Sequence, residues 1–307
     1  MSSNSTLKPL MKKRTTYNKG WTGTFFALPY LIFFTVFTVL PVFVSVFLSF
    51  TEFNMLEMPK FIGMDNYLRM FLEDSIFIKA VGNTLMFAVI LGPGGYLLSM
   101  LFAWFINEIR DPKIRALVTL AFYAPSVCGN NLIFWTLIFS SDSNGVLNGI
   151  LYALGITSSP ILFLQTPQYI FPIVIFVSLW GSFGTGFLSF IAGFKGVDRS
   201  YYEAAAMDGI SNRWQELWYV TLPIMRPQML FSAVMSITSS FTVGGTITAL
   251  CGYPTTNYAA QTIMNHLDDY GGTRYELGYA SAISVILFIM MVGFNLLIQR
   301  LISKVGE

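Results

Sequence analysis

Six long apolar stretches constrain the fold of this chain more than any other feature. They cover residues 24–50, 80–106, 116–139, 167–194, 227–251 and 277–299. Each is longer than the roughly 20 residues that a helix needs to cross the hydrocarbon core of a bilayer. Composition agrees, because 54% of the residues are hydrophobic and 11% are charged, against about 25% charged in a soluble domain. The sequence therefore predicts an all-α integral membrane protein with six transmembrane helices.

Charges outside the stretches predict the side of the membrane on which each loop lies. Lysine and arginine concentrate in residues 1–20, 107–115 and 195–226 and in the C-terminal tail. Positive residues stay on the cytoplasmic side, so both termini are expected inside the cell. The first stretch is expected to remain as an anchor, because it exceeds the about 7–15 apolar residues of a signal peptide. The expected parts are therefore a cytoplasmic basic tail, a six-helix transmembrane domain and a second cytoplasmic tail, over residues 1–20, 21–303 and 304–307.

The six stretches contain no Asp, Glu, Lys, Arg or His. Proton-coupled transporters usually need ionisable groups within the membrane, although sodium can be held by carbonyl and hydroxyl oxygens. The chain also has no GxxxxGK[ST] nucleotide-binding motif. We therefore expect no catalytic residue, and we expect a protein that moves a solute with energy from a partner, or passively.

Few residues in the chain are suited to metal binding or disulfide formation. The single histidine, His266, is expected to be a polar residue of an outer loop, and the two cysteines, Cys128 and Cys251, are expected to be reduced. No metal site and no cofactor are predicted. The net charge of +2 is too small to indicate a nucleic-acid partner.

Neutral polar side chains lie within the stretches and favour a neutral, polyhydroxylated solute. Hydroxyls, amides and indoles suit such a solute, whereas a carboxylate or phosphate would need a basic partner. The residues predicted to line a substrate pathway are Asn130, Asn131, Trp180, Ser182, Thr238 and Ser239. Helix-to-helix packing is the alternative, and it is favoured for a stripe of small residues at every fourth position. This stripe consists of Ser232, Ser236, Ser240, Gly244 and Thr248.

Residues 195–226 form the longest polar interval on the predicted cytoplasmic side, and they indicate two short helices. Ser200 and Glu203 form a capping box, so the first helix is expected to begin after Ser200. Gly209 suits the left-handed conformation that ends a helix.

The second helix of this interval is expected over residues 211–220. Ser211 or Asn212 can cap it, and Pro223 and Pro227 are expected to break it. On these residues alone, a docking surface for another protein and an amphipathic helix in the membrane interface are equally good interpretations.

Short motifs in this interval resemble a known family. Glu203-Ala204-Ala205, Asp208-Gly209 and Leu222-Pro223 resemble the EAA loop of ATP-binding-cassette (ABC) importer permeases. The flanking sequences are similar to the carbohydrate branch, which includes the maltose and glycerol-3-phosphate permeases; they are RWQ (213–215), TLP (221–223), RP (226–227), LPYLIFF (28–34) and FIGMDNY (61–67). The resemblance covers nearly the whole chain from about Phe25. Ile210 departs from the usual alanine, and one extra residue separates Gly209 from RWQ.

The resemblance implies that the first helix of the interval is a coupling helix seated in a cleft of a cytoplasmic ATPase. The implied coupling residues are Glu203, Ala204, Ala205, Asp208 and Gly209. The implied partners are a second homologous permease in a heterodimer, two ATPase subunits, an extracytoplasmic solute-binding protein and a sugar. The chain would then be a transport subunit of a bacterial cell membrane and not an enzyme. A stand-alone secondary transporter or facilitator for a neutral polar solute is one alternative, and a membrane scaffold that uses the loop for docking is another.

Overall fold

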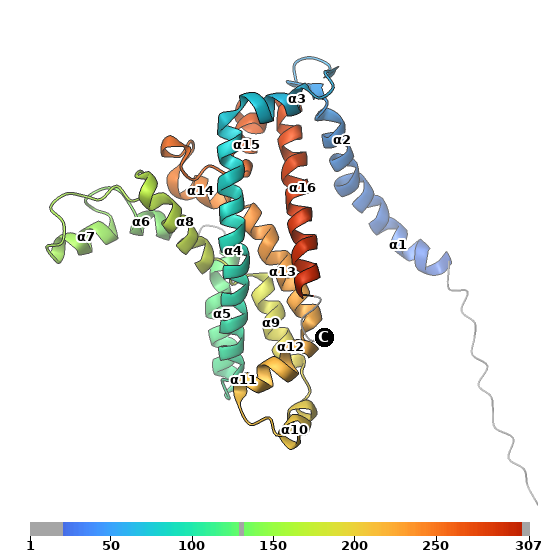
Figure 1. Cartoon of the computed structure of the whole chain (residues 1–307), viewed down its shortest axis with the longest axis vertical. Coiled ribbons are helices and arrows are strands. Elements are labelled where there is room, and N and C mark those ends of the chain that lie inside the picture. The colour runs from blue at the N-terminus through green and yellow to red at the C-terminus, as the bar shows by residue number, and fades with distance from the viewer. Residues whose placement is uncertain (1–20, 129–131, 303–307) are drawn as a thin grey trace, which may run out of the picture. The chain divides into compact units, whose positions relative to one another are not determined.

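The computed structural model describes residues 21–128 and 132–302, which are almost entirely helical (Figure 1). The chain divides into two units, Met1–Phe47 and Leu48–Glu307. In the first unit, α1 (Trp21–Phe34) continues through a π-helical segment (Thr35–Val39) into α2 (Leu40–Leu48). The apolar part of this helix, Thr24–Leu48, is long enough to cross a membrane.

Four helices form the centre of the second unit. They are α4 (Ser75–Asn107), α9 (Thr185–Gly196), α13 (Arg226–Phe241) and α16 (Leu277–Ile302), and α4 and α13 each contact two or more of the others. Phe187 and Phe190 of α9 and Phe241 of α13 are fully buried in this centre, whereas the equally buried Phe87 of α4 stacks on Phe171 of α8. Since lipid is as apolar as these side chains, close packing and interhelical hydrogen bonds hold the helices together.

Shorter elements surround this centre. They are α3 (Asp65–Leu68), α5 (Pro112–Val127), α6 (Leu132–Ile138), α7 (Val146–Ala153), α8 (Pro167–Trp180), α14 (Gly244–Cys251), α15 (Ile263–Asp268), the π-helical segments Arg69–Glu73 and Asp269–Thr273, and a 3₁₀ turn at Thr256–Tyr258.

A small two-stranded sheet follows α2 and was not predicted from the sequence. Strand β1 (Thr51–Glu52) pairs antiparallel with β2 (Lys60–Phe61). The Gly278 amide donates to the Phe53 carbonyl at 3.1 Å, and a Cβ on Gly278 would overlap the Thr51 carbonyl oxygen. The glycine therefore lets the strand lie directly against the first turn of α16.

The helices account for the apolar stretches, but three of the stretches contain breaks that hydropathy did not predict. Within the described residues, only α1–α2, α4 and α16 are long and apolar enough to span a membrane alone, and bent helix pairs raise the number of candidate spans to as many as six. One of these pairs, α8 and α9, is bent by 40°. The third predicted stretch is divided into α5 and α6, and the fifth into α13 and α14. Hydropathy misses the break between α8 and α9 and the break between α13 and α14 because their residues, 181–184 and 242–243, are themselves small or apolar.

Two helices flank Gly209, in line with the sequence prediction. The first is α10 (Arg199–Met207), and Gly209 follows it with φ of +91°. The start of α10 differs from the prediction, because Asp198 is the cap and accepts a hydrogen bond from the Ser200 amide at 2.9 Å. The predicted capping box on Ser200 is therefore wrong.

The second helix, Arg213–Ile224, is called the lever below. It comprises α11 (Arg213–Gln215), a π-helical segment (Glu216–Thr221) and α12 (Leu222–Ile224). Asn212 caps it, as predicted, by accepting from the Trp214 amide. The break predicted at Pro223 and Pro227 falls between these two prolines, because the lever ends at Ile224 and α13 begins at Arg226 with Pro227 in its first turn. The chain turns at Met225, where the lever and α13 meet at 83°.

Candidate functional site

A cavity of about 580 Å³ lies between α4, α5, α6, α8, α9 and α13. Its lining includes the indoles of Trp135 and Trp180 and many hydroxyl groups. None of the described residues that line it is charged or a histidine. Such a surface offers hydrogen bonds and aromatic faces to a solute without a charge to neutralise.

Close approach of three helices builds one wall of the cavity. Gly95 of α4 faces the break between α8 and α9, and a Cβ there would lie 3.0 Å from the Ser182 Cβ. At the same level, Ser99 donates to the Ser182 carbonyl at 3.1 Å, and Ser236 donates to the Gly92 carbonyl at 2.7 Å. These hydroxyls connect helices in lipid, where a polar group needs an internal partner.

Three residues of the lining have a buried hydroxyl without a partner. The Tyr96, Ser178 and Ser182 oxygens are shielded from solvent and make no hydrogen bond within the described part of the chain. Leaving a buried polar group unpaired costs about 1–3 kcal/mol, so rotation of these side chains toward a bound solute with hydroxyls of its own would be favourable.

Four of the six predicted pathway residues line this cavity. Trp180, Ser182, Thr238 and Ser239 come from two helices and the break between α8 and α9, and they lie far apart in the sequence. Asn130 and Asn131 lie outside the described residues. Tyr96 also lines the cavity but was not predicted to do so from the sequence. The only indication in the sequence is a single phenol directly after Gly94 and Gly95.

The stripe of small residues packs helices together and also contributes to the lining. Ser232 donates to the Gly186 carbonyl at 2.8 Å, and Thr248 accepts from the Asn265 amide at 2.8 Å. Ser232, Ser236 and Ser240 also line the cavity. Helix packing and lining of the substrate pathway were the two alternatives that the sequence offered for this stripe. In the structure, residues of the stripe both pack helices together and line the cavity.

The predicted coupling residues lie on or beside α10. Glu203 pairs with Arg199 at 3.1 Å, and both side chains are largely exposed. Ala204, Asp208 and Gly209 are also exposed, whereas Ala205 is 7% exposed. Ala205 therefore supports α10 from within the chain, and the accessible surface consists of the other four residues.

Hydrogen bonding ties α10 to the lever. The Tyr202 and Thr221 hydroxyls lie 3.0 Å apart, and Tyr202 packs against a core cluster that includes Leu217 and Leu222 of the lever. A displacement of α10 would therefore be passed to the lever.

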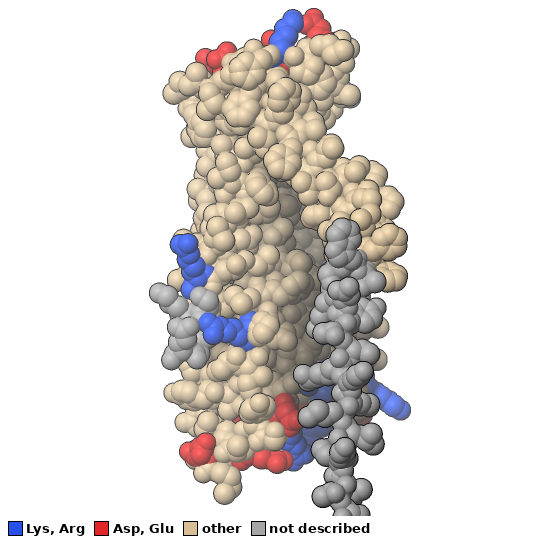
Figure 2. All heavy atoms as spheres, turned by 90° about the vertical axis from the view of Figure 1, so that its right-hand side faces the viewer, with Lys and Arg blue, Asp and Glu red and all other residues tan. Residues whose placement is uncertain are grey.

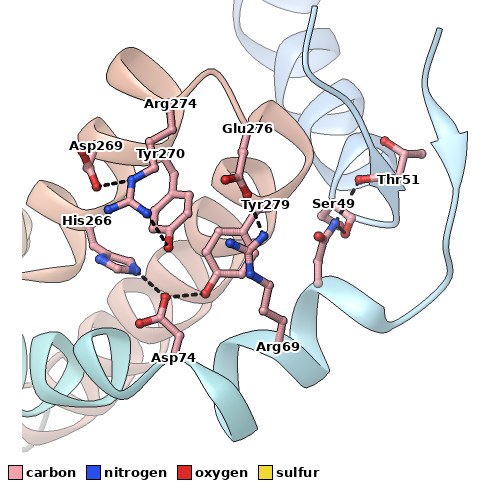
Figure 3. Close-up of polar contacts among 11 residues, drawn as sticks. Ser49, Thr51, Arg69, Asp74, His266, Asp269, Tyr270, Arg274, Glu276 and Tyr279 are labelled. Carbon is pink, nitrogen blue, oxygen red and sulfur yellow. Dashed lines mark hydrogen bonds and ion pairs between the residues drawn. The ribbon is translucent and has the colours of Figure 1, made fainter. Parts of the chain in front are cut away.

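A polar cluster fastens the opposite end of the bundle, where α4, α15 and α16 meet (Figure 3). Asp74 caps α4 by accepting from the Phe77 amide at 2.8 Å. Its second carboxylate oxygen accepts from the Tyr279 hydroxyl at 2.8 Å and lies 2.8 Å from His266 Nε2. His266 was expected to be a polar residue of an outer loop, and this differs from the structure, where its side chain is 3% exposed.

The electrostatics of Asp74 follow from this geometry. Burial alone would raise the pKa of Asp74, but hydrogen bonds from His266, the Phe77 amide and Tyr279 outweigh it and hold the pKa well below its usual range. The carboxylate is therefore ionised and can only accept, so the imidazole donates to it.

Two further ion pairs surround this carboxylate. Arg69 pairs with Glu276 at 2.6 Å and lies over the Tyr279 ring at 4.4 Å. Arg274 pairs with Asp269 at 2.8 Å and lies over the Tyr270 ring at 4.3 Å. These contacts join the segment before α4 to the start of α16, about 200 residues later in the sequence.

Charged side chains are unevenly distributed over the described part of the molecule. On the face shown in Figure 2, charged residues lie at the top and in the lower half, and a broad charge-free band separates them. Together with the long apolar helices and the internal cavity, this distribution defines a helical membrane transport protein.

Comparison with known proteins gives the family. The profile of the binding-protein-dependent transport system inner membrane component family matches residues 95–306, and the chain belongs to this family. A probable ABC transporter permease, YesP of Bacillus subtilis, is 33% identical over 92% of this chain and 90% of its own length. The multiple sugar-binding transport system permease MsmF of Streptococcus mutans is 30% identical over 97% of this chain and 100% of its own.

A solved structure has the same fold. A chain of a bacterial alginate ABC transporter, in complex with an alginate pentasaccharide-bound periplasmic protein, aligns with a TM-score of 0.76. It is 25% identical, and the alignment covers 94% of this chain and 96% of that one. The chain is thus a sugar ABC importer permease subunit of the bacterial cell membrane.

Asp74→Asn tests the polar cluster, because asparagine can still cap α4 but carries no charge. We expect the variant to lose about 2 kcal/mol of stability, the usual contribution of hydrogen bonds to a charged group. Since the folded-state pKa of Asp74 is depressed, its contribution is full above about pH 4, the ordinary Asp value, and is lost as the pH falls through the folded-state pKa. Thermal melts in detergent should show a deficit that persists at neutral pH and shrinks in strong acid.

Asp65→Asn is the matched control. Asp65 is an exposed acid of α3 at the same end of the molecule, and its substitution should leave the melting temperature unchanged. An equal loss in both variants would contradict the role given to Asp74.

Proposed function

We propose that this chain and a second homologous permease form the translocation pathway for a neutral oligosaccharide. The observation that carries the proposal is the cavity, with its hydroxyl and indole lining and no charged residue among the described ones. The related solved structure comes from a transporter of alginate, an acidic polysaccharide. A carboxylate is best held by arginine or lysine, so an uncharged lining favours a neutral sugar.

Separate ATPase subunits supply the energy in this proposal. The sequence has no nucleotide-binding motif, and α10 presents a small, largely exposed surface at Glu203, Ala204, Asp208 and Gly209. With both termini in the cytoplasm, α10 lies on the side where ATP is available. Two ATPase subunits would each hold one coupling helix, one from each permease of the heterodimer.

A continuous set of contacts leads from α10 to the cavity. The hydroxyls of Tyr202 and Thr221 join α10 to the lever, and the lever turns into α13 at Met225. Ser236, Thr238 and Ser239 of α13 line the cavity. Closure of the ATPases on ATP would therefore displace α13 and change the access to the cavity without any charge in the membrane.

An extracytoplasmic solute-binding protein delivers the sugar in this proposal. The family is defined by dependence on such a protein, and the related solved structure contains one. The loops over 140–166 and 252–276 lie on the side predicted to face it. Both the binding protein and the cavity would then contribute to the choice of sugar.

Glu203→Lys and Gly209→Trp test the coupling surface. Lysine reverses a charge on the exposed side of α10, and tryptophan adds bulk at a positive φ that side chains rarely adopt. We expect normal membrane insertion, weaker co-purification of the ATPase and at least about a tenfold loss of ATP-dependent uptake, or roughly 1.4 kcal/mol.

Glu57→Lys controls for the charge reversal. Glu57 is exposed and pairs only with Lys60, at the end of the molecule opposite α10. Sugar uptake by the Glu57→Lys variant should match uptake by the native protein. Undiminished uptake and ATPase binding in the α10 variants would show that α10 is not the coupling surface.

Trp180→Ala tests the cavity as the sugar pathway. Trp180 is 46% exposed and lines the cavity beside Trp135, so its removal should not unfold the protein. We expect the KM for uptake to rise about tenfold through the loss of an aromatic contact. Phe288→Ala, at a similarly exposed ring of α16 outside the cavity, should leave the KM unchanged, and an unchanged KM for Trp180→Ala would place the pathway elsewhere.

A further inference from the structure

The lever exposes an aromatic face that the coupling role of α10 does not use. Trp214, Trp218 and Tyr219 are 60%, 64% and 68% exposed. The other side of the same helix is buried, and its innermost residues are Leu217, Val220, Thr221 and Leu222. The lever already packs against the rest of the chain through this buried side. The exposed rings are therefore not needed for packing within the chain.

The direction of the lever indicates what lies against that face. The lever and α13 together form one broken candidate span, bent by 83°. Of the two, α13 packs along α4, which is long and apolar enough to span a membrane alone, so α13 is the part that crosses. A helix nearly perpendicular to a spanning helix runs parallel to the membrane plane. In Figure 1, α11 and α12 lie near the level at which α5 begins, whereas α10 lies farther from the spanning helices. The lever is thus at the depth where the hydrocarbon core gives way to headgroups.

The chemistry of the exposed rings fits this depth. Tryptophan and tyrosine concentrate at the membrane–water interface, because an apolar ring can enter the acyl region while the N–H or O–H remains hydrated. The accessible surface of α10 is mixed, with small or charged residues at Glu203, Ala204 and Asp208 beside the exposed Tyr201 and Met207. A water-exposed protein contact suits that surface, and a lipid contact suits the lever.

The beginning of the lever is also fixed at this level. Arg213 pairs with Glu216 at 2.7 Å and with Glu108, just beyond α4, at 3.8 Å. The Trp214 ring packs on Trp104 of α4, with centroids 4.7 Å apart. The end of a spanning helix therefore holds the lever at the interface.

We propose that Trp214, Trp218 and Tyr219 insert into the lipid interface and make the lever a membrane-anchored arm. The lipid surface is the partner of these rings, while α10 remains the contact of the ATPase. An arm anchored along its length can pivot about its own axis, so movement of α10 would turn the lever and tilt α13 rather than pull it out of the bilayer. The inference extends the proposed function, but the lipid contact itself does not require the coupling role.

The test places an environment-sensitive fluorophore on the full-length chain in lipid nanodiscs. Cys128 and Cys251 are replaced by serine, and Tyr219→Cys is labelled with a nitrobenzoxadiazole group, which leaves both tryptophans of the face in place. Met207→Cys on α10, at a position 89% exposed, is the matched control. Labelled chains are used only if they assemble and transport like the unlabelled protein.

Lipids that carry a spin label near the headgroup should quench the probe at position 219 several-fold more than the probe at 207. A water-soluble quencher should show the opposite order. Addition of the ATPase subunits should protect the 207 probe and leave the 219 probe unchanged.

Two results would overturn the lipid anchor. Water accessibility at 219 that disappears only when the ATPase is added would make the ATPase the partner of the aromatic face. Shielding of 219 from both quenchers in the paired permeases alone would make the second permease the partner. A 207 probe that the ATPase does not affect would instead refute the coupling role of α10 and leave the lipid anchor standing.

Discussion

Hydrogen bonds from small hydroxyls to backbone carbonyls on neighbouring helices hold the cavity in place. Ser99 reaches the Ser182 carbonyl in the break between α8 and α9, and Ser236 reaches the Gly92 carbonyl of α4. Lipid offers a polar group no partner, so a broken helix within a membrane needs such bonds. They allow the backbone to open a space while its polar groups stay satisfied. The interior is thereby polar enough for a sugar without carrying a charge.

The two ends of the bundle are built differently. At one end, the ionised Asp74 gathers donors from α15 and α16, and cation–π contacts surround it, so three elements far apart in sequence are fixed together. At the other end, α10 and the lever have broad exposed surfaces and few long-range ion pairs among the described residues. This asymmetry suits a protein that receives movement at one end and transmits it through α13 to the cavity.

The sequence predicted the features that depend on composition and local chemistry. Hydropathy located the apolar helices, and Gly209 and Asn212 marked the turn and cap between α10 and the lever. Trp180, Ser182, Thr238 and Ser239 were chosen for their polarity, and they line one cavity; their role in a substrate pathway stays a prediction. Features that depend on distant neighbours could not be predicted. His266 is buried because Asp74, 192 residues away, lies beside it. Tyr96 was missed because a single phenol in an apolar stretch gives no periodic signal.

In the proposed mechanism, the uncharged pathway moves sugar only when α10 is driven from outside the membrane. The direct measurement is uptake of a labelled neutral oligosaccharide by proteoliposomes that contain the chain alone, or the chain with the permease, ATPase and binding protein that co-purify with it. We expect accumulation only in the full assembly and only while ATP is hydrolysed. Equilibration of the sugar by the chain alone, without an ATPase, would contradict this mechanism and would make the protein a facilitator.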